Sequence, residues 1–561
     1  MAHEKRRSAI FGDKAGTVGA MPKDRWFCYN SGMNNTTRRD FVTKTAALAL
    51  LSCRGSELFA AAEKKRLNIL YIMTDDHAAH AIGAYGSRIN KTPHIDRLAR
   101  EGMLLKNCFC TNPICTPSRA GILTGEYSHR NGVPVFNDIS TDIKTVGGYM
   151  RDAGYYSAFV GKWHLGGPKT VRDEDWDRWM VYANQGVYFD PWFWEKKDGK
   201  IVKTVYRGEY ATENITKVTK SVIDDALATG KPFFVMMHHK APHRNWLPSD
   251  KYRAAFRKLT LKDIPPPDTL FDKWEGRASA IKTTAMTLLK HMRLKEDLKL
   301  AEYFSQGGEF EFEGRRYEGA KDASGKFVDA WPEGMDDRAK TALSYLRYMQ
   351  DYLACVQSVD DSVGDMCDYL ARKGVLDSTV VIYTSDQGFF LGDHGLYDKR
   401  FIMDEVARMP FIVRCPALIA PKSVNSDIIT NIDFAPTFLD IADEPRPGRM
   451  QGESFLGNLS GATPDAWRED CYLRYYVEGG EHATSAWYGI RTKTDALVYY
   501  YKRDEWEYFD IVKDPDEIRN EYTNPTYKAR IGFLKKRLSA LKAKLGDNDR
   551  YANAREYGPV E

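Results

Sequence analysis

A cysteine, a proline and an arginine stand close together in the segment Cys115–Arg119. Pro117 suits the first turn of a helix, where no backbone N–H is needed, and Gly125 suits the end of that helix. Cys115 would then lie at the positive N-terminal end of the helix, where anions bind readily. Arg119 follows four residues later and shares a helix face with Cys115, so its guanidinium can fork onto an anionic oxygen. This pattern favours attack by a reactive side chain on a sulfate or phosphate group.

Oxygen-bearing side chains follow two apolar runs elsewhere in the chain. Asp75 and Asp76 follow one run, and Asp386 and Gln387 follow another. Carboxylate and amide oxygens suit a hard divalent cation such as Ca²⁺, which can acidify a hydroxyl and draw off negative charge. Taken alone, the Asp75–Asp76 pair could equally well be an ordinary polar end of a strand that binds no metal.

Four apolar runs of β-branched and aromatic residues end abruptly in such polar side chains. These runs are 67–73, 156–160, 232–237 and 379–384. Continuous runs of this length are typical of strands buried on both faces, and hence of a parallel sheet covered by helices. The second run leads into Lys162 and His164, which are two positions apart on an extended segment and therefore point the same way.

Helical patterns lie between the apolar runs. They cover 92–101, 145–153, 213–228 and 340–373. Alternating strands and helices predict a doubly wound α/β fold, in which sites form beyond the carboxyl ends of the strands. The reactive residues described above fall at those ends.

Two regions depart from this alternation. Residues 262–340 carry three consecutive prolines, many charges and a glycine-rich stretch, so we interpret them as an insertion over one rim of the sheet. From residue 451 to 561 the pattern changes to short strands followed by a helix over 526–545. This change predicts a smaller antiparallel C-terminal subdomain after a catalytic domain that covers 63–450.

The composition excludes several classes of protein. The chain has 561 residues, is 43% hydrophobic and carries a net charge of +4. Residues 1–62 hold a surplus of five positive charges, so the rest is near neutral and gives no electrostatic case for nucleic-acid binding. The chain contains no run of about 18 apolar residues, which excludes a polytopic membrane protein. Nine cysteines without paired Cys-x-x-Cys spacing argue against a disulfide scaffold or a zinc site.

The first 62 residues have the pattern of an export signal. Arg38 and Arg39 precede an apolar stretch and a small-residue zone, which predicts a twin-arginine signal over 33–62 with residues 1–32 as an upstream extension. An amphipathic helix is the alternative. Residues 50–53 also resemble a lipobox, which would leave a lipid anchor on Cys53. Both the signal and the lipobox place the mature protein outside the cytoplasm, in the periplasm or beyond, with the twin-arginine machinery as a partner.

The string Cys-x-Pro-Ser-Arg-Ala-x-x-x-Thr-Gly, at 115–125, resembles the signature of type I sulfatases in the alkaline phosphatase-like superfamily. The resemblance extends from Asn68 to about Leu456. It implies a large mixed, mostly parallel sheet between helices, with a smaller C-terminal antiparallel sheet plus helix. It also implies that Cys115 is oxidised to Cα-formylglycine by a formylglycine-generating or anaerobic sulfatase-maturating enzyme.

The family chemistry explains why the cysteine must be modified. One hydroxyl of a hydrated aldehyde attacks sulfur, and the other then collapses the covalent sulfate ester back to the aldehyde. Plain cysteine could not release its sulfate that way. The resemblance implies Ca²⁺ as the cation. Its implied ligands are Asp75, Asp76, Cys115, Asp386 and Gln387. Many relatives have Asn or His where Gln387 stands, so this position departs from the common pattern.

The resemblance also implies roles for the cationic residues. Lys162 and His164 would contact the sulfate and help to activate the nucleophile, and Lys399 would bind the sulfate. His243 would lie near the leaving oxygen as a general acid. Asp393 and His394 lie in the same segment as Lys399 and are candidates to touch the sugar. His238 and His239 are instead expected to pack at the strand end.

The implied substrate is an extracellular sulfated carbohydrate. The segments 239–246 and 386–400 are similar to those of sulfatases that act on carbohydrate 6-sulfates such as N-acetylglucosamine-6-sulfate. Four tryptophans are candidates to stack on sugar rings, with burial in the core as the alternative: Trp192, Trp194, Trp246 and Trp274. Two other functions remain open. One is a phosphodiesterase or phosphonate monoester hydrolase of the same superfamily, and the other is a catalytically silent glycan-binding relative.

Overall fold

The computed structural model describes residues 66–557 except residue 183. The predicted twin-arginine signal, the upstream extension and Cys53 lie outside the described residues. Within the described part, no helix is both long enough and apolar enough to cross a membrane. The seven cysteines of this part are all buried and form no disulfide.

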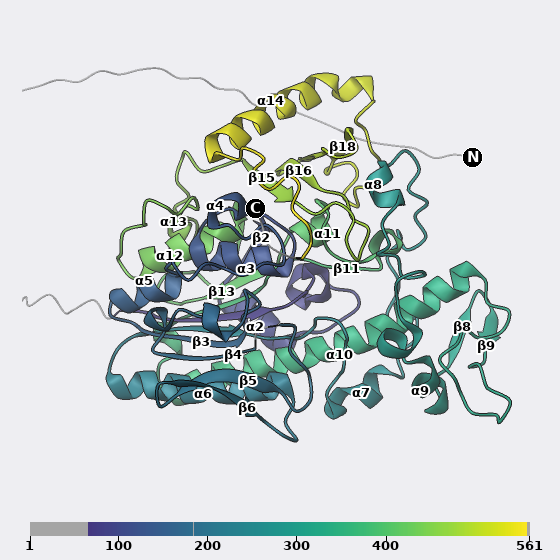
Figure 1. Cartoon of the computed structure of the whole chain (residues 1–561), viewed down its shortest axis with the longest axis horizontal. Helices are drawn as coiled ribbons and strands as arrows, with labels where there is room; N and C mark the ends of the chain where they lie inside the picture. The colour runs from purple at the N-terminus through teal and green to yellow at the C-terminus, as the bar shows by residue number, and fades with distance from the viewer. Residues whose placement is uncertain (1–65, 183, 558–561) are drawn as a thin grey trace, which may run out of the picture. The chain divides into compact units, whose positions relative to one another are not determined.

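A ten-stranded sheet forms the centre of the fold (Figure 1). Its strands, in spatial order, are β14 (Ser423–Thr430), β2 (Met103–Phe109), β13 (Phe411–Arg414), β10 (Thr379–Ser385), β1 (Asn68–Thr74), β7 (Phe233–His238), β3 (Tyr156–Lys162), β4 (Arg178–Tyr182), β5 (Trp192–Lys197) and β6 (Lys200–Val205). Only β13 and β5 run against the other strands of this sheet. The predicted mixed, mostly parallel sheet is therefore confirmed.

The four strands predicted from apolar runs lie side by side at the centre of this sheet. Every residue of β1, β7 and β10 is buried, which is why their sequences are continuously apolar instead of alternating. The register pairs Thr74 of β1 with Ser385 of β10, and Met73 with His238 of β7. Because these carboxyl ends are level, the residues that follow them meet at one edge of the sheet.

Helices cover both faces of the sheet, as Figure 1 shows. On one face the core includes side chains of α2 (Pro93–Glu101), α6 (Ala211–Thr229) and α10 (Asp337–Arg372). The core of the other face includes side chains of α3 (Cys115–Thr124), α5 (Val146–Asp152) and α12 (Phe434–Ile441). Shorter helices lie in the connections: α4 (Ser128–Asn131), α7 (Asp250–Phe256), α11 (Asp404–Ala407) and α13 (Leu456–Leu459).

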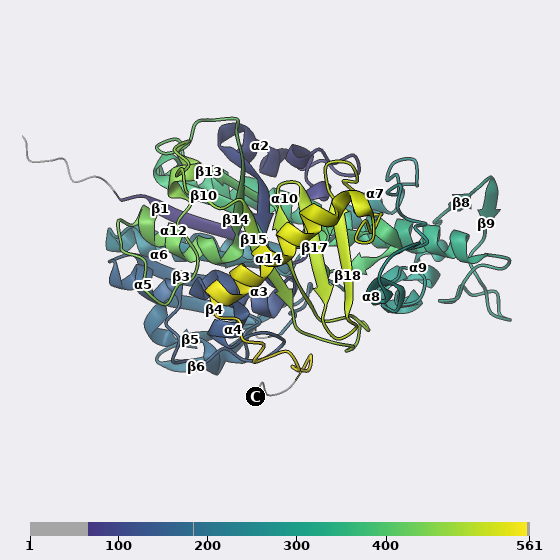
Figure 2. The same ribbon diagram turned by 90° about the horizontal axis from the view of Figure 1, so that it is seen from above.

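The region 262–340 forms short elements beyond the sheet. It contains α8 (Ser279–Lys282), α9 (Leu300–Ser305) and a small hairpin of β8 (Phe310–Phe312) and β9 (Arg315–Tyr317). In Figures 1 and 2 this hairpin and α9 project at one end of α10. The exact limits of this insertion remain a prediction.

A second, smaller sheet follows near the C-terminus. It is antiparallel and contains β15 (Asp470–Tyr475), β16 (Trp487–Thr492), β17 (Asp495–Tyr500) and β18 (Glu505–Asp510). The helix α14 (Lys528–Leu545) lies across it in Figure 2 and packs through Ile531, Leu534 and Leu538. The predicted C-terminal sheet and helix are confirmed, although β18 was not predicted. The boundary at residue 450 remains a prediction.

A buried ion pair ties the insertion to the smaller sheet. Arg277 donates to Glu507 on β18 from Nε at 2.7 Å and from Nη2 at 3.3 Å, and both side chains are fully shielded from solvent. Arg277→Ala is expected to lower the free energy of unfolding by about 3–5 kcal/mol, because it leaves an uncompensated buried carboxylate. The midpoint of thermal unfolding measures this effect.

The exposed pair Arg316–Glu309 of the same insertion is the matched control for Arg277→Ala. Its side chains are 65% and 71% exposed at an N–O distance of 2.6 Å. Arg316→Ala should therefore cost only about 0–1 kcal/mol. Adding Glu507→Gln to Arg277→Ala should restore part of the lost stability. Equal midpoints for the two single variants would contradict this account.

Candidate active site

The predicted nucleophile segment forms the helix α3, whose first residue is Cys115. Every residue of α3 is buried, and Gly125 caps the helix with a φ of 68°, a left-handed conformation that favours glycine. Two hydroxyls fix the first turn. Thr116 Oγ1 donates to the carbonyl oxygen of His164 at 2.9 Å, and Ser118 Oγ donates to the carbonyl oxygen of Asp386. These bonds anchor the first turn of α3 to the segments that follow β3 and β10.

Arg119 does not reach the cavity that Cys115 lines. Its guanidinium is fully buried and forks onto Asp386 Oδ2, from Nε at 3.1 Å and from Nη2 at 2.9 Å. Nη1 donates to the carbonyl oxygen of Lys162 at 2.8 Å. The predicted forked contact exists, but its anion is a protein carboxylate and not a ligand. Arg119 follows Cys115 by one helix turn, and its Nε and Nη2 are taken up by the carboxylate of Asp386.

The two carboxylates that follow β1 are each paired with a lysine ammonium group. Lys162 Nζ contacts Asp75, and Lys399 Nζ contacts Asp76. Burial raises the pKa of Asp75, but Lys162 and the other cations lower it by more, so this pKa lies well below its usual range. Burial raises the pKa of Asp76 to about 7, against the opposing effect of Lys399. Similarly, burial and then Asp75 raise the pKa of Asp386 to about 6.

The same cluster has the oxygen ligands that a hard cation needs. Asp75 Oδ1 and Gln387 Oε1 are buried and have no hydrogen-bond partner among the described residues. The Asp76 backbone N–H donates to Asp386 Oδ1 at 3.2 Å, which brings the third carboxylate to the same place. Three carboxylates and an amide oxygen form a donor set that suits Ca²⁺. The predicted oxygen ligands therefore fit this cation.

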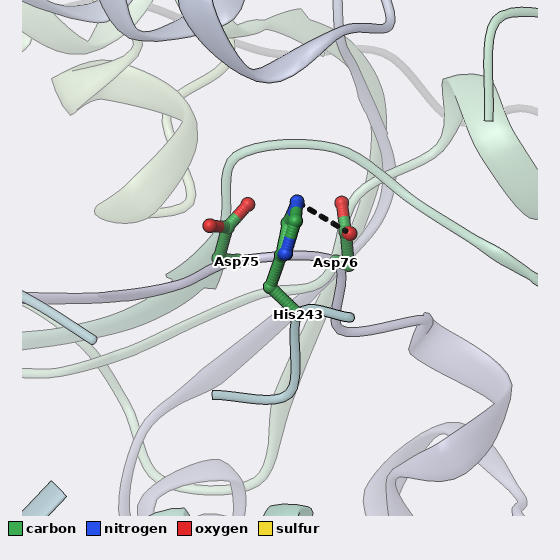
Figure 3. Close-up of side chains that lie close together, drawn as sticks. All are labelled: Asp75, Asp76 and His243. Carbon is green, nitrogen blue, oxygen red and sulfur yellow. Dashed lines mark ion pairs between the residues drawn. The ribbon is translucent and has the colours of Figure 1, made fainter. Parts of the chain in front are cut away.

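His243 lies beside the carboxylates, as Figure 3 shows. Ligand atoms of Asp75, Asp76 and His243 lie within 4.8 Å of one another, and His243 Nε2 is 3.7 Å from Asp76 Oδ2. His243 Nδ1 contacts the carbonyl oxygen of Arg244 at 2.5 Å; a carbonyl only accepts, so Nδ1 carries the proton and Nε2 of the neutral ring is an acceptor. Imidazole nitrogen is not a preferred ligand of Ca²⁺. His243 is therefore better placed to contact a substrate than a calcium ion.

A cavity of about 450 Å³ opens over this cluster. Its floor includes Asp76, Cys115, His243 and Lys399. Burial raises the pKa of the Cys115 thiol to about 11, against the opposing effect of Lys399 and Lys162, so the thiol is protonated at neutral pH. Six predicted site residues lie near the floor but do not line the cavity: Asp75, Arg119, Lys162, His164, Asp386 and Gln387.

One wall of the cavity carries residues that the sequence analysis did not single out. Asp398 Oδ1 is 2.6 Å from Arg400 Nη1, and Asp398 Oδ2 is 2.8 Å from His482 Nε2. Lys240 also lines the cavity, and burial lowers its pKa to about 7. Asp398 and Arg400 flank Lys399, so their position beside a predicted sulfate ligand was an available signal. His482 lies in the connection between β15 and β16 of the smaller C-terminal sheet, and no local pattern indicates it.

Asp393 and His394 lie away from the cavity, contrary to their expected contact with the sugar. Asp393 Oδ2 is 3.3 Å from His80 Nε2, where it lines a different cavity. His394 Nδ1 is 3.1 Å from Asp272 Oδ2. The backbone turns between these residues and Lys399, with positive φ at both His394 and Asp398. Neighbours of Lys399 in the sequence therefore face different directions.

Other aromatic and histidine candidates also lie outside the cavity lining. His238 Nδ1 is 3.3 Å from the carbonyl oxygen of Lys162, and His239 Nε2 is 3.3 Å from Ser362 Oγ, as expected for packing at a strand end. Trp246 is fully buried in the core. None of the four candidate tryptophans is among the residues that line the cavity: Trp192, Trp194, Trp246 and Trp274.

Comparison with known proteins identifies related sequences and structures. A family model described as sulfatase matches residues 67–444. A second, described as N-sulphoglucosamine sulphohydrolase, C-terminal, matches residues 392–544. The chain is 38% identical over 526 residues to an N-acetylglucosamine-6-O-sulfatase of Bacteroides thetaiotaomicron, and the match covers 90% of both chains. It is 24% identical over 534 residues to a Formosa agariphila ulvan-active sulfatase, covering 90% of this chain and 87% of the other.

A solved structure gives the corresponding match in three dimensions. It is described as a complex with its substrate D-glucosamine-2-N,6-O-disulfate, and it superposes with a TM-score of 0.76 at 36% identity. The match covers 88% of this chain and 100% of the other chain. Together with the family models, this match confirms the resemblance and the fold predicted from the sequence. The chain belongs to the sulfatase family.

Proposed function

We propose that this protein hydrolyses sulfate esters of carbohydrates and releases inorganic sulfate, with the 6-O-sulfate of N-acetylglucosamine or a similar sugar as its favoured substrate. The observation that carries the proposal is the 38% identity to an N-acetylglucosamine-6-O-sulfatase across 90% of both chains. The cavity supports it, because Cys115, Lys399 and His243 meet there beside a polar wall. A sulfate group would meet cations at the floor, and sugar hydroxyls would meet hydrogen-bonding groups on the wall.

The side chains at and below the floor of the cavity suggest different roles in binding and catalysis. Lys399 lines the cavity beside Cys115, so its ammonium group can bind a sulfate oxygen. Lys162 and Arg119 lie outside the lining, where their charges favour the ionised forms of Asp75 and Asp386. His243 lines the cavity with Nε2 3.7 Å from Asp76 Oδ2, and the family resemblance implies that it lies near the leaving oxygen. It can act as a general acid once it has taken up a proton, which a nearby sulfate anion favours.

Calcium and formylglycine complete the proposed site. Asp75, Asp76, Asp386 and Gln387 would hold the ion, whose charge would stabilise the negative charge that develops on the sulfate group. The thiol of Cys115 is a soft ligand that suits such an ion poorly, whereas formylglycine at this position would offer oxygen. The proposal therefore requires a maturating enzyme as a partner. It also places the protein outside the cytoplasm, on the evidence of the twin-arginine pattern in the sequence.

The test compares sulfate release from matched sugar esters. Protein produced together with a formylglycine-generating enzyme is incubated with N-acetylglucosamine carrying a 6-sulfate, a 3-sulfate or a 6-phosphate, and the released anion is measured by ion chromatography. We expect kcat/KM for the 6-sulfate to exceed both others by about tenfold or more, because each misplaced charged contact costs at least about 1.4 kcal/mol. The Cys115→Ala variant, purified in parallel, controls for contaminating hydrolases.

Two results would overturn the proposal in different ways. Turnover of a phosphate diester far above that of any sulfate ester would indicate the phosphodiesterase alternative. Binding of sulfated sugars by correctly matured protein, without release of sulfate from any of them, would indicate the silent glycan-binding alternative.

A further inference from the structure

A segment that follows α14 returns to the active site. Asp547 anchors its beginning, because Asp547 Oδ2 accepts hydrogen bonds from Tyr472 Oη and from Arg474 Nη1, both at 2.6 Å. Tyr551 is buried, and the carbonyl oxygen of Ala552 accepts a hydrogen bond from Tyr501 Oη at 3.3 Å. We call residues 547–557 the strap. These contacts fix its course across the smaller C-terminal sheet.

The far end of the strap is fixed against the cavity wall. The Glu556 carbonyl oxygen accepts a hydrogen bond from the Phe136 backbone N–H at 3.2 Å. Its carboxylate accepts one from the Glu481 backbone N–H at 2.8 Å and lies 3.5 Å from Arg400 Nη2. Glu556 is only 6% exposed, although it lies near the end of the described chain. The strap is thus joined to three residues that line the cavity.

Tyr557 follows Glu556 and presents a large aromatic ring at the cavity. Its ring is stacked on Phe136, with the centroids 5.2 Å apart and an angle of 18° between the planes. Phe136 in turn lies 5.6 Å from the ring of His164. Tyr557 and Phe136 both line the cavity, yet Tyr557 remains 60% exposed. One face of the tyrosine is therefore covered, while much of its surface is open to solvent.

We propose that Tyr557 is a substrate-binding residue whose open ring face stacks on a sugar ring of the substrate. This inference rests on the proposed carbohydrate substrate and adds a binding residue to it. A pyranose ring is amphipathic, with C–H groups on its faces and hydroxyls at its edge. The cavity lining has both characters, because Tyr557 and Phe136 form an aromatic side and the polar residues Asp398, Arg400 and His482 line the same cavity. The contacts of Glu556 hold the aromatic side in place.

The experiment compares Tyr557→Ala with Tyr557→Phe in the matured enzyme. With the sugar sulfate that the wild type turns over best, we expect Tyr557→Ala to raise KM about fivefold and to change kcat by less than about twofold, because stacking binds substrate and transition state alike. Tyr557→Phe keeps the ring and should retain most of the wild-type KM. Phe533→Ala removes an aromatic ring that is 56% exposed on α14, so it is the matched control and should leave KM unchanged.

A binding measurement separates this inference from the proposed function. In a Cys115→Ala background, calorimetry with the same sugar sulfate should show about fivefold weaker binding when Tyr557→Ala is added. If the wild type hydrolyses the sugar sulfate but Tyr557→Ala keeps both KM and affinity, the stacking role is wrong and the proposed function stands. If no sugar sulfate is hydrolysed, the proposed function fails, and the affinities still decide the role of Tyr557.

Discussion

Replacing Cys115 with alanine is expected to abolish sulfate release while the fold and glycan binding persist. Cys115 is the first residue of α3 and is 1% exposed, and its Sγ makes none of the hydrogen bonds that fix this helix. Alanine fits the same space and is a good helix former. The loss should be on the order of 10⁴-fold or more in kcat, as for other nucleophile deletions. Sulfate release and the midpoint of thermal unfolding measure the two halves of this prediction.

Mass spectrometry tests whether sulfate release depends on the oxidation of Cys115 to formylglycine. Trypsin should release the peptide 107–119, which contains Cys108, Cys110 and Cys115. In protein produced with an active maturating enzyme, an aldehyde is expected at Cys115 alone. Cys108→Ala is the matched control, since Cys108 lies on β2 in the core and should be dispensable for turnover. Full turnover by protein whose Cys115 is an unmodified thiol would contradict the prediction.

The central strands could be predicted because each is buried on both faces, and its sequence is therefore an unbroken apolar run. The same reasoning placed Asp75, Asp386 and Lys162 together, because parallel strands end at one edge of the sheet. The strand β18 was missed because its sequence, Glu-Trp-Glu-Tyr-Phe-Asp, mixes charges with aromatics. Its charge at Glu507 is buried only because Arg277, 230 residues away in the sequence, pairs with it.

The depth and direction of side chains could not be predicted in the same way. Helical spacing predicted that Arg119 shares a face with Cys115, but it gave no information about Asp386, whose carboxylate accepts two hydrogen bonds from the Arg119 guanidinium. In the loop before Lys399, positive φ values reverse the chain, so Asp393 and His394 face elsewhere. Which other side chains line the cavity depends on contacts between residues that are far apart in the sequence.

Asp76→Asn is expected to remove stabilisation by calcium while changing the metal-free protein little. Asp76 Oδ1 accepts contacts from Lys399 Nζ and Gln387 Nε2, and an amide oxygen can accept both. Loss of the charge weakens the attraction to Lys399 but also relieves repulsion from Asp75 and Asp386, so the metal-free free energy of unfolding should change by no more than about 1 kcal/mol. Thermal unfolding of chelator-treated protein measures this difference.

The response to added calcium should then distinguish the wild type from Asp76→Asn. At a concentration of about 100 times its Kd, calcium should stabilise the wild type by about 2.7 kcal/mol, whereas Asp76→Asn should gain much less because one of three carboxylate ligands has lost its charge. Activity should fall by about 10²-fold or more, since the ion supplies several kcal/mol of charge stabilisation.

Asp360→Asn is the matched control. Asp360 is equally buried, but it accepts backbone N–H groups of His94 and Ile95 and does not line the cavity, so it should keep the full response to calcium. An Asp76→Asn protein that retains both the calcium shift and full turnover would show that these carboxylates do not bind the ion.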